Sequence, residues 1–145
     1  MSDAAAKTQA SRVRPKYLNL QALLFEIRLP LPGWISILHR ISGALMFVLL
    51  PLLIWLFDKS LTSEVSYEQF TSTFVAGLGI FPGWFLKLVV LALIWAFLHH
   101  FIAGLRHLWM DATHSVSKEF GHSSALVTLG LSVLLTLVLG FKLFF

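Results

Sequence analysis

The sequence predicts an all-α membrane protein in which three transmembrane helices follow a cytoplasmic N-terminal segment. Of its 145 residues, 57% are hydrophobic and only 12% are charged, whereas a soluble domain is about half apolar and about a quarter charged. Three apolar stretches are each long enough to cross about 30 Å of hydrocarbon at about 1.5 Å per residue. A small integral membrane domain therefore accounts for most of the chain.

Punctuating residues help to place the three spans. The predicted spans are, in chain order, residues 34–57, 84–110 and 124–144. Pro32-Gly33 precedes the first span and Pro82-Gly83 precedes the second, and such pairs typically mark turns. Pro51 lies inside the first span, so we expect a kink there, which membrane helices tolerate.

The positive charges predict the orientation of the spans. Eight Lys and Arg residues lie on the side of the N-terminus, namely Lys7, Arg12, Arg14, Lys16, Arg28, Arg40, Arg106 and Lys118. Three lie on the other side, namely Lys59, Lys87 and Lys142. The positive-inside rule therefore predicts a cytoplasmic N-terminus and a C-terminus on the outer side of the membrane. A bacterial inner membrane, with the mitochondrial inner membrane as the less favoured alternative, is what the family resemblance given below implies.

The segments outside the spans have their own predicted roles. Residues 1–33 are predicted to form a cytoplasmic tail and an interfacial segment, because the stretch 18–31 is too polar to span and suits an interface or a docking partner. Residues 34–145 then form the three-helix membrane anchor domain. The outward loop 58–83 is predicted to contain a short surface helix, because Ser66-Tyr-Glu-Gln69 resembles a capping box.

The composition excludes two kinds of site. The chain has no cysteine, so it holds no disulfide and no Cys-ligated iron–sulfur cluster. A redox centre in this chain must be bound by His or Met or be organic. The basic residues sort by membrane side and form no basic face with interleaved aromatic residues, so no nucleic-acid partner is expected.

The inner end of the second span carries several ionisable side chains, which are costly in hydrocarbon and typically mark a cofactor, an ion or an electron path. His100 and His107 are seven residues apart and share one helix face with Gly104 between them, while Arg106 points about 100° away. His100 lies about 10 Å deeper than His107. Its imidazole is a candidate iron ligand, and Asp111 is placed to accept the ring N–H of His107.

The first span carries a matching polar stripe. Ser36, Arg40 and Gly43 are spaced by four and three residues, and His39 lies beside them. His39 and Arg40 are predicted at the membrane depth of Arg106 and His107, and four potential cations at one level require anions. The propionates of a haem are suitable carboxylates. Ser36 with Arg40 also offers donors for a carbonyl oxygen on a small head group.

Simpler structural roles account for some of these side chains. An interhelical hydrogen bond is the expected role of His99, and His114 and His122 fall in the inner loop, where solvation is adequate. Arg40 or Arg106 alone could extend to lipid phosphates. Such contacts do not explain the whole polar set on two helices at one depth.

Taken together, these residues resemble the cytochrome b556 membrane-anchor subunits of succinate dehydrogenase, respiratory complex II. The resemblance covers most of the chain and rests on two motifs in the family's order, on the first and second spans. The matching segments are Arg14-Pro15, Ser36-Ile-Leu-His39-Arg40-Ile-Ser42-Gly43 and His100-x-x-x-Gly104-Leu105-Arg106-His107-Leu108-x-Met110-Asp111.

The resemblance implies a haem b bound axially through His100, with the second axial ligand supplied by a companion anchor subunit. The residues that it implies around the haem propionates are His39, Arg40, Arg106 and His107. Ser36 and Arg40 match positions that line a ubiquinone site. A flavoprotein subunit and an iron–sulfur subunit would deliver electrons from succinate, so the chain alone is not expected to be active.

Three alternatives remain at this point. The chain could anchor a fumarate reductase that runs the same reaction backwards, and the quinone that the complex accepts would decide between the two. It could be a structural or assembly subunit without a cofactor, in which case the histidines only bridge helices. A transporter is the least favoured, because three spans lack the paired repeats of such folds.

Overall fold

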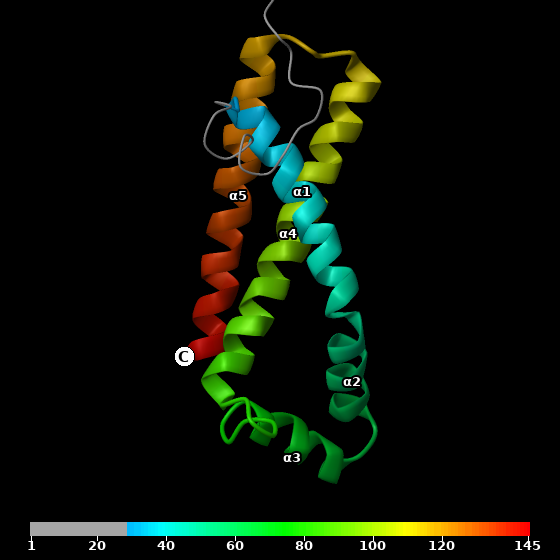
Figure 1. Cartoon of the computed structure of the whole chain (residues 1–145), viewed down its shortest axis with the longest axis vertical. Coiled ribbons are helices and arrows are strands. Elements are labelled where there is room, and N and C mark those ends of the chain that lie inside the picture. The colour runs from blue at the N-terminus through cyan, green and yellow to red at the C-terminus, as the bar shows by residue number, and fades with distance from the viewer. Residues whose placement is uncertain (1–28) are drawn as a thin grey trace, which may run out of the picture.

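The computed structural model describes residues 29–145, and in this part of the chain the regular elements are five α-helices (Figure 1). In chain order they are α1 (Leu31–Val48), α2 (Leu50–Leu61), α3 (Glu64–Thr73), α4 (Gly83–Thr113) and α5 (Lys118–Phe144). Three of them, α1, α4 and α5, are long and apolar enough to span a membrane. The predicted fold class is therefore confirmed. The predicted interfacial stretch 18–31 lies almost entirely outside the described residues.

The first predicted span is divided into two helices. α1 ends at Val48 and α2 begins at Leu50, with Pro51 in its first turn. Proline has no amide hydrogen and its ring clashes with the preceding turn, so the helix cannot continue through it regularly. Leu49, at the break, has φ −90° and ψ 2°. The expected kink is confirmed, although the prediction of one continuous helix over 34–57 is not.

The other two spans are longer than predicted. α5 begins at Lys118, six residues before the predicted start at 124, because the Ser117 hydroxyl accepts the amide hydrogen of Phe120 at 3.2 Å and caps the helix. α4 ends at Thr113, three residues beyond the predicted end, and the next residue, His114, caps it in the left-handed conformation at φ 52°. Hydropathy finds only the part of a helix that lies in hydrocarbon, so polar end turns escape it.

The outer loop contains the predicted surface helix, α3, but its cap differs from the prediction. Ser63 is the N-cap, and its hydroxyl accepts the amide hydrogen of Ser66 at 3.1 Å. The Ser66 hydroxyl in turn accepts the amide hydrogen of Ser63 at 2.8 Å. Ser66 is thus the third helical residue of the capping box rather than its first, and Gln69 takes no part in the cap.

Small side chains let α5 approach α4 closely, which is the usual way in which helices associate in lipid. The buried residues of α5 are Gly121, Ala125, Thr128, Ser132, Thr136 and Gly140. The buried hydrophobic cluster of the described chain consists of Ile35, Ala103 and Ala125, one each from α1, α4 and α5. α4 packs against both other spans, and it is therefore the element that positions the polar residues.

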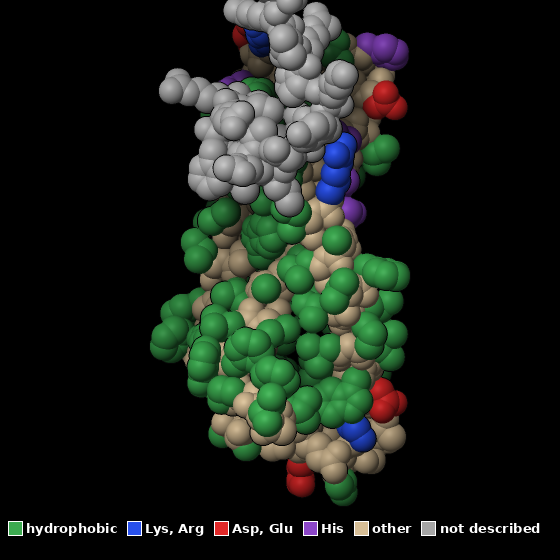
Figure 2. Space-filling model, in the orientation of Figure 1, with side chains coloured by type: hydrophobic (Ala, Val, Ile, Leu, Met, Phe, Trp, Pro, Cys, Tyr) green, Lys and Arg blue, Asp and Glu red, His purple; other side chains and the backbone are tan. Residues whose placement is uncertain are grey.

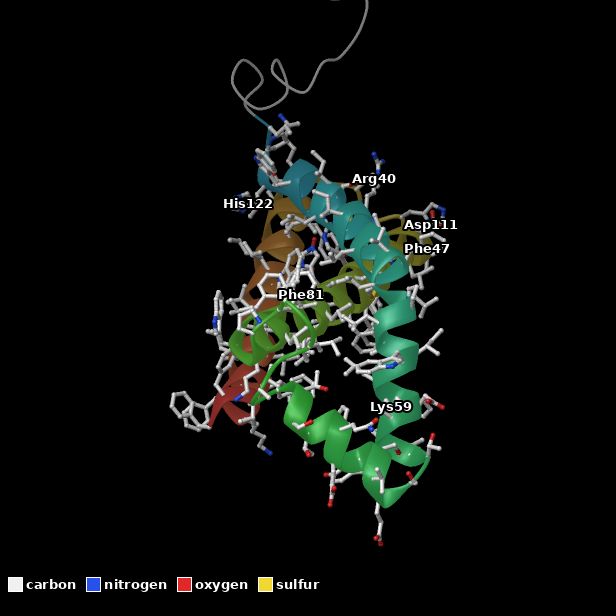
Figure 3. The ribbon with its side chains drawn as sticks, turned by 60° about the horizontal axis from the view of Figure 1, so that its bottom comes forward. Arg40, Phe47, Lys59, Phe81, Asp111 and His122 are labelled. Carbon is white, nitrogen blue, oxygen red and sulfur yellow. The ribbon has the colours of Figure 1, made fainter. Side chains whose placement is uncertain are left out.

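The surface carries its large apolar side chains over the middle of the molecule and its charges near the two ends (Figure 2). Phe47 and Phe57, for example, are 79% and 65% exposed. Arg40 and Asp111 lie near the end where α1 begins, whereas Lys59 lies toward the opposite end (Figure 3). A membrane-spanning bundle requires such an apolar band between two polar ends.

The two halves of the bundle differ in packing. α2 lies apart from α4, beyond the crossing of α1 and α4 (Figure 1), and α2, α3, α4 and α5 line an open apolar cavity of about 720 Å³. Leu53, Phe74 and Phe97 are among its lining residues. α1, α4 and α5 pack more closely at the other end, where the histidines lie.

Candidate functional site

Three histidine rings meet where α1 crosses α4. The rings of His39 and His100 are stacked with centroids 4.1 Å apart and planes 20° from parallel. The ring of His107 lies 5.3 Å from that of His39 and is tilted by 52°. The two spans therefore bring together the histidines that the sequence placed at their inner ends.

Hydrogen bonding shows which nitrogen of the His100 ring donates. Its Nδ1 lies 3.0 Å from the carbonyl oxygen of His39, and because a carbonyl can only accept, Nδ1 must carry the hydrogen. The Ser42 hydroxyl donates to the same carbonyl at 2.8 Å and lies 3.3 Å from Nδ1. A neutral imidazole with its hydrogen on Nδ1 has a lone pair on Nε2, and that lone pair can bind a metal.

Ser42 is the residue of this site whose role the sequence reasoning missed. It lies inside the first motif, but its motif position alone did not single it out. Its hydroxyl is buried between the two helices and contacts both members of the carbonyl–imidazole pair. The signal was its spacing, since Ser42 follows His39 by three residues and so lies over the same helix face.

Gly43 provides the space in which the His100 ring lies. A Cβ atom at Gly43 would come within 2.9 Å of Cε1 and 3.2 Å of Nδ1 of that ring, which is too close for real contacts. Gly104 is less constrained, because a Cβ atom there would lie 3.6 Å from His39 Nε2, an ordinary contact distance. The glycine that the site requires is therefore the one on α1.

The remaining predicted residues occupy different surroundings. Arg40 is exposed and extends from α1 (Figure 3), Ser36 is half-buried one turn earlier, and His107 is exposed. His39 is half-buried, and its Nε2 is buried with no hydrogen-bond partner among the described residues. The expected hydrogen bond from His107 to Asp111 is not formed within residues 29–145.

Arg106 faces away from the histidines and toward α5. Its Nε donates to the Ser124 hydroxyl at 2.9 Å and its Nη2 donates to the Gly121 carbonyl at 3.1 Å. The side chain is only 8% exposed. The structure thus brings His39, His100 and His107 together but directs Arg106 to the neighbouring interface, in keeping with the 100° offset expected from its position.

His99 makes the interhelical hydrogen bond that its position suggested. The residue is fully buried, and its Nδ1 lies 3.2 Å from the hydroxyl oxygen of Ser132 on α5. Its ring also stacks on Trp95, with centroids 5.3 Å apart. His114 and His122 are both exposed, as expected, but His122 lies on α5 rather than in the inner loop where the sequence placed it.

The arrangement fits one axial ligand to a haem better than a bare metal ion. Within residues 29–145, no three or more side chains from His, Asp and Glu converge in a way that could hold a metal ion. A haem iron needs only one or two protein ligands, because the porphyrin supplies the others. His100 offers a free Nε2 beside a glycine cradle, with further histidines and Arg40 nearby, and these residues fit such a group.

The fold and the polar site define a small multi-pass membrane subunit. Residues 13–139 match the family described as Succinate dehydrogenase/Fumarate reductase transmembrane subunit. This match covers most of the chain, and the chain belongs to that family, whose members are the membrane anchors of these enzymes. The resemblance drawn from the two motifs is thereby confirmed.

Individual relatives support the same assignment. The succinate dehydrogenase cytochrome b556 subunit of Coxiella burnetii is 35% identical over 112 residues, which are 77% of this chain and 82% of that protein. The cytochrome b556 subunit of Paracoccus denitrificans is 30% identical over 77% of this chain and 80% of its own length. The cytochrome b560 subunit of Reclinomonas americana is 31% identical over 77% and 76%, respectively.

Proposed function

We propose that this chain is the haem-binding membrane anchor of a succinate:ubiquinone oxidoreductase. The observation that carries the proposal is the hydrogen bond from His100 Nδ1 to the His39 carbonyl. Haem and metal ligands usually donate their second ring nitrogen in this way, which fixes the tautomer and the ring plane and raises the basicity of the ligating nitrogen. The names of the relatives, cytochrome b556 and b560, supply independent support for a b-type haem.

In this proposal His100 is one axial ligand, and a companion anchor subunit supplies the other. The residues proposed to lie around the propionates are His39, Arg40 and His107, with Arg106 at the same level but turned toward α5. Arg106 uses Nε and Nη2 on α5, so its contribution is the charge that it keeps at this level and the donors that remain on Nη1. When bound, the haem supplies a one-electron carrier whose potential depends on its axial ligands and surroundings.

Ser36 and Arg40 are proposed to bind the quinone head group. They are four residues apart on α1, so their side chains lie on one face near the membrane surface. Arg40 donates to, and electrostatically stabilises, a quinone oxygen as negative charge develops on it, and Ser36 donates to a carbonyl oxygen. A site at this level is open to a lipid-soluble substrate and close to water that supplies protons.

The proposed assembly includes a flavoprotein subunit and an iron–sulfur subunit on the cytoplasmic side, because the family is that of a transmembrane subunit of these enzymes and this sequence has no cysteine to bind an iron–sulfur cluster. Its N-terminus is proposed to lie in the cytoplasm and its C-terminus in the periplasm of a bacterial inner membrane. Residues 1–33 are proposed as the cytoplasmic and interfacial segment, and residues 34–145 as the anchor domain. A fumarate reductase anchor is the second candidate, since the family includes both enzymes.

The haem assignment is tested by His100→Ala in the complex purified with its companion subunits. We expect the reduced-minus-oxidised b-type bands and the pyridine haemochrome to be lost or severely weakened, because the iron loses one ligand. His122→Ala, an exposed histidine on α5, is the matched control and should keep both. Imidazole added to His100→Gly should restore the bands, and unchanged bands in His100→Ala would remove this residue from the ligand role.

The quinone assignment is tested by Arg40→Leu. We expect quinone reduction to fall by about 100-fold, the size of loss typical when one donor to a developing negative charge is removed. Succinate oxidation with a soluble artificial acceptor should survive, because it does not need the membrane site. Lys59→Leu removes a cation at the opposite end of the molecule and should leave both activities unchanged. Equal loss of both activities in Arg40→Leu would indicate failed assembly instead.

A further inference from the structure

Two polar contacts join α4 to α5 along one buried stripe. His99 bonds Ser132, and both residues are fully buried. Arg106 donates hydrogen bonds to the Ser124 hydroxyl and the Gly121 carbonyl, two helical turns closer to the inner end. His99 and Arg106 are seven residues apart, so they lie two turns apart on the same face of α4. The face of α4 that packs against α5 is thus held at two points.

The direction of the His99–Ser132 hydrogen bond is defined by the surrounding groups. The Ser132 hydroxyl donates its single hydrogen to the Leu129 carbonyl at 3.0 Å. Ser132 therefore accepts from His99, whose Nδ1 must carry the hydrogen. The other ring nitrogen, Nε2, is buried without a hydrogen-bond partner among the described residues. A buried imidazole is costly unless it is hydrogen-bonded, and the bond to Ser132 is the one that fixes the direction of this ring.

His99 is the immediate neighbour of His100 in α4, so their side chains point about 100° apart. With His99 directed to α5, His100 is directed to the His39 carbonyl on α1. Apolar faces alone define such a rotation poorly, because lipid solvates them as well as another helix does. A hydrogen bond between fully buried partners is formed at one rotation and one depth only.

We propose that His99 and Ser132 are a positioning pair that sets the rotation of α4 and thereby the plane of the His100 imidazole. Arg106 with Ser124 fixes the same rotation two turns further along. This inference rests on the proposed function, because the ring that is oriented is the proposed axial ligand. The positioning pair, His99 and Ser132, lies outside both motifs, and it gives α5 a role in the haem site although α5 contributes no proposed ligand.

Ser132→Ala and His99→Leu each remove the hydrogen bond. In the purified complex we expect the g-values of the oxidised haem and its midpoint potential to change, since both depend on the plane of the axial imidazole, and haem retention to weaken on the order of tenfold. His99→Asn keeps a donor at the position of Nδ1 and should restore values close to those of the wild type. Thr128→Val removes an equally buried hydroxyl of α5 that bonds only its own helix, to Ser124 O, and should change neither signal.

A second measurement separates this proposal from the haem assignment. In the His100→Ala background, His99→Leu, Ser132→Ala and the double variant form a cycle in Tm that does not depend on a ligating His100. Non-additive Tm changes there, together with altered g-values when His100 is present, support the positioning pair. Additive Tm changes, or unchanged g-values and potential in both single variants, would overturn it. Loss of the proposed function alone would appear instead as b-type bands that survive His100→Ala.

Discussion

At the scale of single residues, the site depends on one backbone carbonyl and one missing side chain. The His39 carbonyl orients the His100 ring, and Gly43 leaves the volume that this ring occupies. Both belong to α1, while the ring belongs to α4. The candidate ligand is therefore positioned by a helix other than its own. Small substitutions on α1 should change the orientation of the His100 ring although His100 itself is unchanged.

Gly43→Ala is the sharpest residue-level test of this arrangement. The added methyl group would lie 2.9 Å from His100 Cε1, so the ring must rotate or move away, and its hydrogen bond to His39 weakens. We expect haem content per assembled complex to fall by about tenfold, a loss typical when a group that orients a metal ligand is disturbed. Pyridine haemochrome assays on the purified complex measure it.

Two other glycines serve as controls for this prediction. A Cβ atom at Gly104 would make only an ordinary contact, and one at Gly130 on α5 would meet nothing within 4 Å. Gly104→Ala should have a small effect, and Gly130→Ala should leave haem content unchanged. Equal haem content in all three variants would contradict the cradle assigned to Gly43.

Residue-level prediction from sequence succeeded where helix periodicity decides the outcome. The seven-residue spacing of His100 and His107 and the offset of Arg106 both follow from about 100° per residue, and both agree with the structure. The partner of Arg106 could not be foreseen, because it depends on the rotation of α5, and a uniformly apolar helix does not encode its rotation in hydropathy. The contact of Ser42 with His100 depends on how α1 and α4 are rotated against each other, and it was missed although the spacing from His39 already placed Ser42 on the same helix face.

At the scale of secondary structure, caps and prolines decide where the helices end. Pro51 divides the first span, and Ser117 extends the third beyond its apolar part. The proline could be recognised in the sequence because its effect is local. The cap of α3 was placed three residues too late because Ser63 and Ser66 both suit an N-cap, and only the backbone geometry distinguishes them.

The cap of α3 yields an element-level prediction. Ser63→Ala removes the acceptor for the Ser66 amide and should destabilise α3 by about 1 kcal/mol. Hydrogen exchange at the first turn of α3 should accelerate about fivefold in the intact complex, while α4 and α5 remain unchanged. Gln69→Ala is the control, since its side chain takes no part in the cap. Faster exchange in Gln69→Ala and not in Ser63→Ala would restore the capping box first inferred from the sequence.

At the scale of the whole molecule, the membrane determined what could be predicted. Backbone groups in hydrocarbon must bond within their own helix, so three long apolar stretches leave few alternatives to three helices. The packing of these helices was not predictable in the same way. Small residues permit close approach along several faces, and the polar contacts of His99 and Arg106 select among them.

The orientation of the whole chain can be tested with single cysteines, because the sequence has none. Val116→Cys lies in the loop between α4 and α5, and Glu68→Cys lies on α3, and both positions are exposed. In intact cells, a membrane-impermeant thiol reagent applied from the periplasmic side should label Glu68→Cys and spare Val116→Cys. Detergent should expose both. Labelling of Val116→Cys alone in intact cells would reverse the predicted topology.

The buried hydrophobic cluster of the described chain holds only Ile35, Ala103 and Ala125, which has a practical consequence for isolating the subunit. Detergent molecules compete for the small apolar surfaces through which the spans contact one another, so a micelle can separate the helices. Extraction that removes the annular lipids should separate α1 from α4 early. This separation would break the hydrogen bond between the His100 ring and the His39 carbonyl. Nanodiscs should preserve that contact where small, harsh micelles lose it.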